Sequence, residues 1–331
     1  MPHSKRVLLS RRELLAATCG TACSLWLAGC SGESKARTKR PEQVVLANEQ
    51  AMPPIDFVSF NSILQRGPVA PDEAFANSQW AQRIKAADML RVGGILPSPF
   101  FCMLVDNEGA YRGLDAGLFQ LLARYLTGDA THCSFEPLGV GDREVALVDD
   151  LVDAVFATYV ATPERKELID FSNPYFESYQ SIMVLATTDD VSTVADLANK
   201  PVVVKSHSSS IPLMQKVCPT AQLEQITADE EARLALAQNR AVAYVGNDIL
   251  QMSTVACNPN TYKIVGNPLG DPEEFCIGLP KDSGAVDFVN EFLTQIKASG
   301  LLEELAQVTI YNRVNPPEEE DETKVEDQNG D

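Results

Sequence analysis

The chain has 331 residues, of which 45% are hydrophobic, so it can bury a sizeable core and form one large or two ordinary domains. Its formal net charge is −19 at pH 7, and a surface of that sign disfavours binding to nucleic acid. We therefore expect a globular protein with no nucleic-acid partner.

Residues 1–29 have the pattern of an export signal, with a basic start followed by a short apolar run. The run is shorter than the ~20 residues that cross a bilayer as a helix. Paired arginines at 11 and 12 resemble a twin-arginine signal. The sequence Leu-Ala-Gly-Cys at 27–30 resembles the lipobox of bacterial lipoproteins, which implies a diacylglyceryl lipid on Cys30. Two acyl chains are sufficient for stable attachment to a membrane.

Two further segments are predicted to lack a fold of their own. Residues 30–71 begin polar and basic and continue Pro-rich, which predicts a flexible tether between the lipid and the folded domain. Residues 313–331 are acidic and almost free of apolar side chains, which predicts a disordered tail.

Helix and strand patterns occupy the rest of the chain. Trp80, Ile84 and Ala87 recur at helical spacing and predict a short helix within residues 72–88. From Leu90 onward, strand and helix patterns alternate, which predicts an α/β fold. The predicted strands cover residues 90–96, 133–139, 154–160, 201–206, 241–246 and 274–280. The predicted helices cover residues 113–125, a short stretch between 139 and 154, residues 211–217 and 229–238, a stretch from about 248, and residues 286–296.

These elements predict two lobes: the chain begins in the first, forms the second, and then returns to the first. Lobe 1 would consist of residues 72–188 and 272–312, and lobe 2 of residues 189–271. The chain would cross between them near residues 185–192 and again near 266–273, forming a hinge. A ligand would bind between the lobes, at strand ends and helix N-termini.

Five cysteines remain after the lipobox: Cys102, Cys133, Cys218, Cys257 and Cys276. Outside the cytoplasm one or two disulfides are permitted. We expect Cys218 to pair with Cys257, because each directly follows a predicted helix of the same lobe. The cysteine spacing does not resemble a zinc site, and we expect no metal and no cofactor.

Residues 162–178 read TPERKELIDFSNPYFES, and this string resembles the polar amino-acid family of bacterial extracellular solute-binding proteins, family 3. The likeness extends over about residues 90–307 and is nearest to the glutamate/aspartate-binding subgroup. It implies a two-lobed fold of the type II periplasmic-binding-protein kind, with two parallel-type sheets flanked by helices. It also implies a function: a monomer on the extracytoplasmic face of the cell membrane captures a small amino acid and delivers it to an ABC transporter permease.

The resemblance assigns roles to residues of the first lobe. Arg165 matches the arginine that clamps the ligand α-carboxylate, since a planar guanidinium offers paired donors to a carboxylate. Arg143 matches an arginine that binds the side-chain carboxylate in glutamate and aspartate binders, although a solvated helix arginine also fits the pattern. Thr158 matches a hydroxyl position of the same subgroup. Phe100 and Phe101 match an aromatic shelf for the ligand, and core packing explains at least one of them equally well.

In the second lobe, Ser208 and Ser209 lie between a strand and a helix, where backbone N–H groups and hydroxyls can receive an anion. Their alternative role is to cap that helix. The family usually holds the ligand ammonium with an Asp, but the matching residue here is Asn247. Asp248 would replace it if the turn shifted by one residue. Otherwise, the ligand would be an acid without an ordinary α-amino group.

Two other functions use the same scaffold. One is an exported enzyme resembling a cyclohexadienyl or arogenate dehydratase, which would need a proton-transfer acid such as Glu144 or Glu177 in the cleft. The other is a ligand sensor that feeds a membrane receptor. We expect a binding protein and no catalytic residues.

Overall fold

The computed structural model describes residues 54–105, 109–258 and 260–314 of the 331. The predicted signal peptide and Cys30 lie outside the described residues, and so do residues 315–331 of the predicted tail. Within the described part, no helix is both long and apolar enough to cross a membrane.

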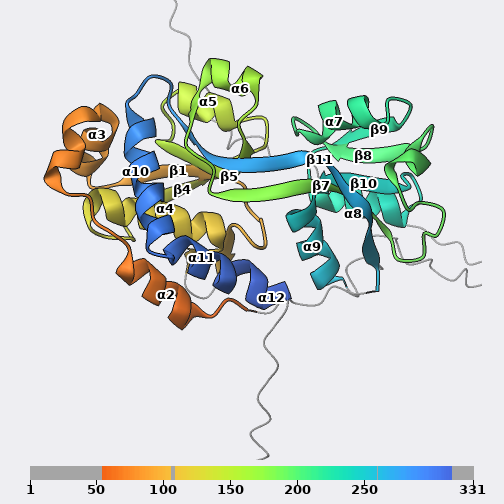
Figure 1. Ribbon diagram of the computed structural model, residues 1–331, viewed down its shortest axis with the longest axis horizontal. Helices are drawn as coiled ribbons and strands as arrows, with labels where there is room; N and C mark the ends of the chain where they lie inside the picture. The colour runs from red at the N-terminus through yellow and green to blue at the C-terminus, as the bar shows by residue number, and fades with distance from the viewer. Residues whose placement is uncertain (1–53, 106–108, 259, 315–331) are drawn as a thin grey trace, which may run out of the picture. The chain divides into compact units, whose positions relative to one another are not determined.

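A mixed sheet connects the described elements (Figure 1). The strands are ordered β4-β1-β5-β11-β7-β10-β8-β9, and β6 also pairs with β11. Parallel pairs lie toward both ends of this order, whereas β7 and β11 pair antiparallel to their neighbours. The strand bounds are β1 Leu90–Gly94, β4 Cys133–Pro137, β5 Ala154–Val160, β6 Asp170–Phe171, β7 Phe176–Leu185, β8 Pro201–Lys205, β9 Gln222–Ile226, β10 Ala243–Asn247 and β11 Tyr262–Leu279.

The long strands β7 and β11 join the two halves of the sheet. Their register runs from Phe176 opposite Phe275 to Leu185 opposite Tyr262. One end of β11 pairs with β5 of the first half, and β7 pairs with β10 of the second. This confirms the two-lobed α/β fold with two crossings, although the halves share one hydrogen-bonded network.

The position of the first crossing differs from the predicted residues 185–192. Ile182, Met183 and Val184 are already buried in the second lobe, so the chain crosses within the first part of β7. An unbroken apolar strand carries no turn signal, which explains why the prediction fell too late. The second crossing contains the predicted residues 266–273, where the register of β11 shifts on both sides of Leu269.

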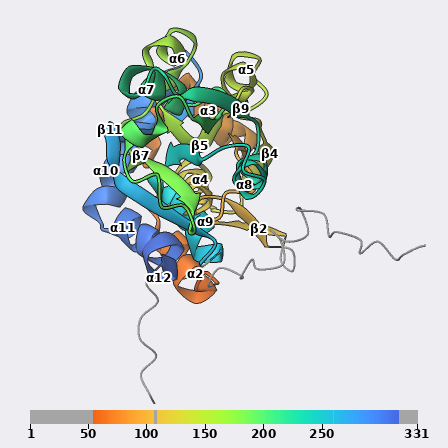
Figure 2. The same cartoon turned by 90° about the vertical axis from the view of Figure 1, so that its right-hand side faces the viewer.

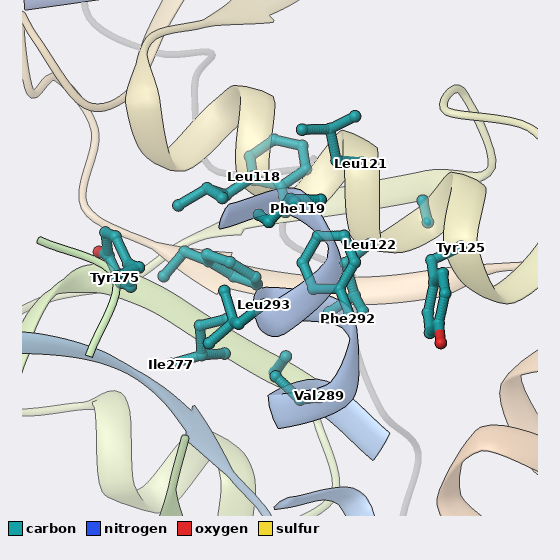
Figure 3. Close-up of a cluster of buried hydrophobic side chains, with 14 of the residues drawn as sticks. Leu118, Phe119, Leu121, Leu122, Tyr125, Tyr175, Ile277, Val289, Phe292 and Leu293 are labelled. Carbon is teal, nitrogen blue, oxygen red and sulfur yellow. The ribbon is translucent and has the colours of Figure 1, made fainter. Parts of the chain in front are cut away.

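The core of the first lobe forms around α4 Leu114–Thr127 and α10 Ala285–Ala298 (Figure 3). Nearly every residue of α4 is buried, because other helices cover it as well as the sheet. Gly113 precedes α4 at a φ of 131°, and a Cβ there would lie 2.3 Å from the carbonyl oxygen of Phe101. Only glycine fits such a backbone approach. The other elements of this lobe are β2 Met103–Val105, β3 Ala110–Arg112, α5 Arg143–Val148, α6 Pro163–Leu168, α11 Leu301–Ala306, the π-helical turn η3 Gln307–Tyr311 and α12 Asn312–Val314.

A helical layer precedes β1 and packs on the first lobe (Figures 1 and 2). It consists of α2 Phe57–Arg66, the 3₁₀ turn η1 Asp72–Asn77 and α3 Gln79–Ala87. Phe60, Ile63 and Leu64 of α2 are buried, so this part of the predicted tether is instead folded against the core. The apolar residues of α2 recur at helical spacing, and this signal outweighs the nearby prolines. Arg313, at the start of the predicted tail, is also buried and donates to the carbonyl of Pro99 at 2.7 Å.

The second lobe places helices on both faces of its strands. These elements are η2 Val194–Leu197, α7 Ser210–Val217, α8 Asp229–Ala237 and α9 Asp248–Cys257. The structure contains no disulfide between Cys218 and Cys257, which corrects that prediction. Cys218 packs with Ile182 on one face of the sheet, whereas Val255, two residues before Cys257, packs with Met183 on the other.

Candidate ligand-binding cleft

A cavity of about 240 Å³ lies between the lobes, at the ends of strands and the starts of helices. The first lobe contributes the segment after β1, the end of β5, α5 and α6. The second lobe contributes the ends of β8 and β10, the turn before α7, and residues in the first two turns of α8 and α9. The polar lining residues are Ser98, Arg143, Thr158, Arg165, Lys205, Ser208, Ser209, Asp229, Glu230, Arg233, Asn247, Ser253 and Thr254.

Arg165 lies on α6, whose start is capped by the hydroxyl of Thr162 accepting from the Arg165 backbone N–H at 3.4 Å. Its guanidinium makes three polar contacts. Nε is 3.1 Å from a carboxylate oxygen of Glu144, Nη1 donates to the carbonyl of Val160 at 2.7 Å, and Nη2 donates to the carbonyl of His207 at 2.8 Å. An arginine has five N–H groups, so one on each terminal nitrogen remains for a ligand carboxylate.

Arg143 is buried, with 4% of its surface exposed. Its Nε donates to the carbonyl of Val140 at 2.8 Å, and its guanidinium carbon lies 4.1 Å from the centroid of the Tyr159 ring. The guanidinium carbon of Arg165 lies 5.1 Å from the same centroid. Burial and then the charge of Arg165 lower the pKa of Arg143 to about 10, so it remains a cation at neutral pH. Among the described residues, no carboxylate lies within ion-pair distance of it.

Thr158 lies in the cleft with a φ of 45°, a left-handed conformation that is strained for a β-branched residue. Its backbone N–H points to a carboxylate oxygen of Asp115 at 3.4 Å. The other oxygen of Asp115 accepts from the Tyr175 hydroxyl at 2.6 Å. Burial raises the pKa of Asp115 to about 6, against the lowering effect of these two hydrogen bonds.

Ser208 and Ser209 line the cleft on the second lobe. The Ser208 hydroxyl donates to the carbonyl of Lys205 at 2.6 Å, and the Ser209 hydroxyl accepts from Gln180 at 3.4 Å. Ser209 is at the N-cap position of α7, but its side chain makes no capping hydrogen bond. The backbone donors at the start of this helix are therefore not satisfied by that hydroxyl.

Four charged residues in the cleft were missed by the sequence reasoning. Lys205 pairs with Asp229 at 3.0 Å, and Arg233 is 3.5 Å from Glu230. The signal was available, because Lys205 ends a strand and the two carboxylates open the next helix, the positions at which α/β proteins place ligand contacts. Polar residues at helix starts are also common on surfaces, so the sequence did not single them out.

Asn247 lines the cleft, but Asp248 does not. The Asp248 carboxylate turns toward β7, where it accepts from the Ser178 hydroxyl at 2.7 Å and the Tyr179 backbone N–H at 3.2 Å. The same oxygen also accepts from the backbone N–H of Ile249 at the start of α9. The one-residue shift that would bring Asp248 into the cleft does not occur.

Phe100 and Phe101 also lie outside the cleft lining. Both are fully buried in the core of the first lobe. The ring centroid of Phe101 lies 5.6 Å from that of Phe176 and 5.8 Å from that of Phe275. The core-packing explanation therefore accounts for both residues, and we assign neither a ligand contact.

A cleft of this kind, between two α/β lobes and lined by cations and hydroxyls, is typical of two-lobed solute-binding proteins. Residues 90–308 match the family described as bacterial extracellular solute-binding proteins, family 3. The chain belongs to this family, whose members act outside the cytoplasm.

Known proteins with similar sequences and structures agree with this assignment. The ABC transporter glutamine-binding protein GlnH of Bacillus subtilis is 27% identical over 225 residues, which cover 67% of this chain and 81% of that protein. The glutamate-binding protein GluB of Corynebacterium glutamicum is 28% identical over 214 residues, covering 61% and 72%. A solute receptor for L-cysteine of Neisseria gonorrhoeae superimposes with a TM-score of 0.66 at 23% identity, covering 70% and 94%. This last likeness concerns the fold.

Proposed function

We propose that this protein is the solute-binding component of an ABC importer and that its ligand is an acidic amino acid of the glutamate or aspartate kind. The α-carboxylate would bind the two remaining N–H groups of Arg165, with Thr158, Ser208 and Ser209 around it. The side-chain carboxylate would bind Arg143. The relatives named as glutamine- and glutamate-binding proteins support an amino-acid ligand.

One observation carries the choice of an acidic ligand: Arg143 is a buried cation without a carboxylate partner among the described residues. The other cleft cations each have one, since Arg165 contacts Glu144, Lys205 contacts Asp229, and Arg233 contacts Glu230. Burying a charge is unfavourable unless it is paired. A second carboxylate on the ligand would complete the pairing at Arg143.

Ligand capture would close the two lobes by rotation about β7 and β11, the strands in which the chain crosses between them. The permease would then recognise the closed form. The lipobox supports attachment of the monomer to the membrane through Cys30, which would keep the protein near its permease. Cys30→Ser should release the protein from the membrane fraction in the producing cell.

Isothermal titration with L-glutamate, L-aspartate, L-glutamine, L-arginine and L-cysteine tests the ligand. We expect saturable one-to-one binding of an acidic amino acid, with glutamine weaker by at least about tenfold because it leaves Arg143 unpaired. Tighter binding of a neutral or basic amino acid would refute the assignment. Incubation with a cyclohexadienyl acid, followed by product analysis, tests the enzyme alternative, and we expect no turnover.

A further inference from the structure

The side-chain amide of Asn247 donates a hydrogen bond to a carboxylate on the hinge strand β11, and that carboxylate does not line the cleft. Asn247 ends β10 and lines the cleft, whereas Glu273 lies on β11 and does not line it. The Nδ2 of Asn247 donates to a carboxylate oxygen of Glu273 at 2.8 Å. The residue at the expected ammonium position is therefore connected to a negative charge in a different element.

This contact decides which end of the amide faces the ligand. An ionised carboxylate only accepts hydrogen bonds, so it selects the NH₂ group of Asn247 and leaves Oδ1 for the cleft. Among the described residues, no group donates to that oxygen. Asn247 thus presents a hydrogen-bond acceptor to the cavity, as the usual Asp of the family would.

Glu273 also accepts a hydrogen bond from a residue of β7. The same carboxylate oxygen accepts from Nε2 of Gln180 on β7 at 2.8 Å. Gln180 is oriented in turn, because its Oε1 accepts from the Ser210 hydroxyl at 2.6 Å while its Nε2 lies 3.4 Å from the Ser209 hydroxyl. One carboxylate therefore connects Asn247 to the turn that carries Ser209.

We propose that Glu273 is a positioning residue that determines specificity for α-amino acids. It turns the Asn247 carbonyl oxygen toward the ligand ammonium and supplies, one hydrogen bond away, the negative charge that the amide lacks. The protein therefore selects an acidic amino acid over the corresponding dicarboxylate without an amino group. This inference rests on the proposed function.

The test compares L-glutamate with glutarate, which has both carboxylates and no ammonium. Isothermal titrations use the wild type, Glu273→Gln and the matched control Glu274→Gln, whose side chain is the exposed neighbour on β11. We expect the wild type to prefer L-glutamate and Glu273→Gln to lose at least about tenfold of that preference. Glu274→Gln should keep it. A purely structural role would weaken both ligands alike and leave their ratio unchanged.

A second variant tests the charge itself. Asn247→Asp combined with Glu273→Gln moves the carboxylate to the cleft and should restore the preference for L-glutamate. The proposal is overturned if Glu273→Gln leaves the ratio unchanged while the wild type binds L-glutamate, or if the double variant fails to restore the ratio. If the wild type binds no acidic amino acid, the proposed function fails and this inference fails with it.

Discussion

Arg165 donates a hydrogen bond across the cleft to the carbonyl oxygen of His207, at 2.8 Å from its Nη2. Arg165 belongs to the first lobe and His207, at a φ of 58°, to the turn before α7 in the second. The residue that we assign to the ligand carboxylate is therefore also a contact between the lobes. Ligand binding and lobe closure would share one side chain.

Replacing Arg165 should remove ligand binding while the fold persists. Arg165→Ala loses the charge-assisted hydrogen bonds to the carboxylate, and Arg165→Lys loses their paired geometry. We expect the affinity for the acidic amino acid to fall at least about 100-fold in the first variant and about tenfold in the second. Isothermal titration measures both. Arg240→Ala, which breaks an exposed pair with Glu224, should leave affinity unchanged, and retained binding in Arg165→Ala would contradict the clamp.

Replacing Arg143 should weaken ligand binding without lowering the stability of the ligand-free protein. Arg143→Met keeps much of the side-chain volume and removes a buried charge that has no carboxylate partner among the described residues. We expect the ligand-free protein to be as stable as the wild type or more stable by about 1 kcal/mol. The increase in melting temperature on adding L-glutamate should shrink or disappear. Thermal unfolding with and without ligand tests this, and an unchanged increase would exclude Arg143 from the site.

Asp115 should give the stability a distinctive pH dependence. Burial raises its pKa from 3.8 to about 6, so between these pH values the folded protein binds more protons than the unfolded chain. Its contribution to the free energy of unfolding therefore falls as pH rises through this window. A pKa difference of roughly two corresponds to about 3 kcal/mol. We expect the wild type to lose stability of this order relative to Asp115→Asn between pH 4 and pH 7.

Chemical denaturation at a series of pH values measures that difference. The hydrogen bond from the Tyr175 hydroxyl lowers the pKa of Asp115, so Tyr175→Phe should extend the loss of stability to higher pH. A difference between wild type and Asp115→Asn that does not change with pH would refute the assignment.

The helical layer before β1 should be part of the folding unit, although the family match begins at residue 90. Trp80 is 3% exposed, its Nε1 donates to the carbonyl of Asp153 at 3.0 Å, and its ring lies 6.2 Å from that of Phe288. We expect Trp80→Ala to lower the free energy of unfolding by about 3–5 kcal/mol. Val58→Ala on the exposed face of α2 should change it by less than about 0.5 kcal/mol. Equal changes in the free energy of unfolding for both variants would show that the helical layer is not part of the hydrophobic core.

Local patterns in the sequence were enough to predict much of this protein. The alternation of strands and helices predicted the α/β class, and the motif around Arg165 predicted a two-lobed solute-binding fold. Arg165, Arg143, Thr158, Ser208, Ser209 and Asn247 were all named from the sequence, and the structure places all six around one cavity. The fold class was predictable because periodicity and strand ends are encoded by residues close together in the chain. The ligand contacts assigned to the six residues stay predictions.

Tertiary structure alone decided the direction in which neighbouring side chains point. Asn247 and Asp248 are adjacent, yet one faces the cleft and the other bonds to β7. Phe100 and Phe101 follow a cleft-lining proline and are nevertheless buried in the core. Glu273 and Asn247 are 26 residues apart, and only the pairing of β7 with both β10 and β11 brings them together. Such contacts depend on strand register and on packing between distant segments, which no local pattern encodes.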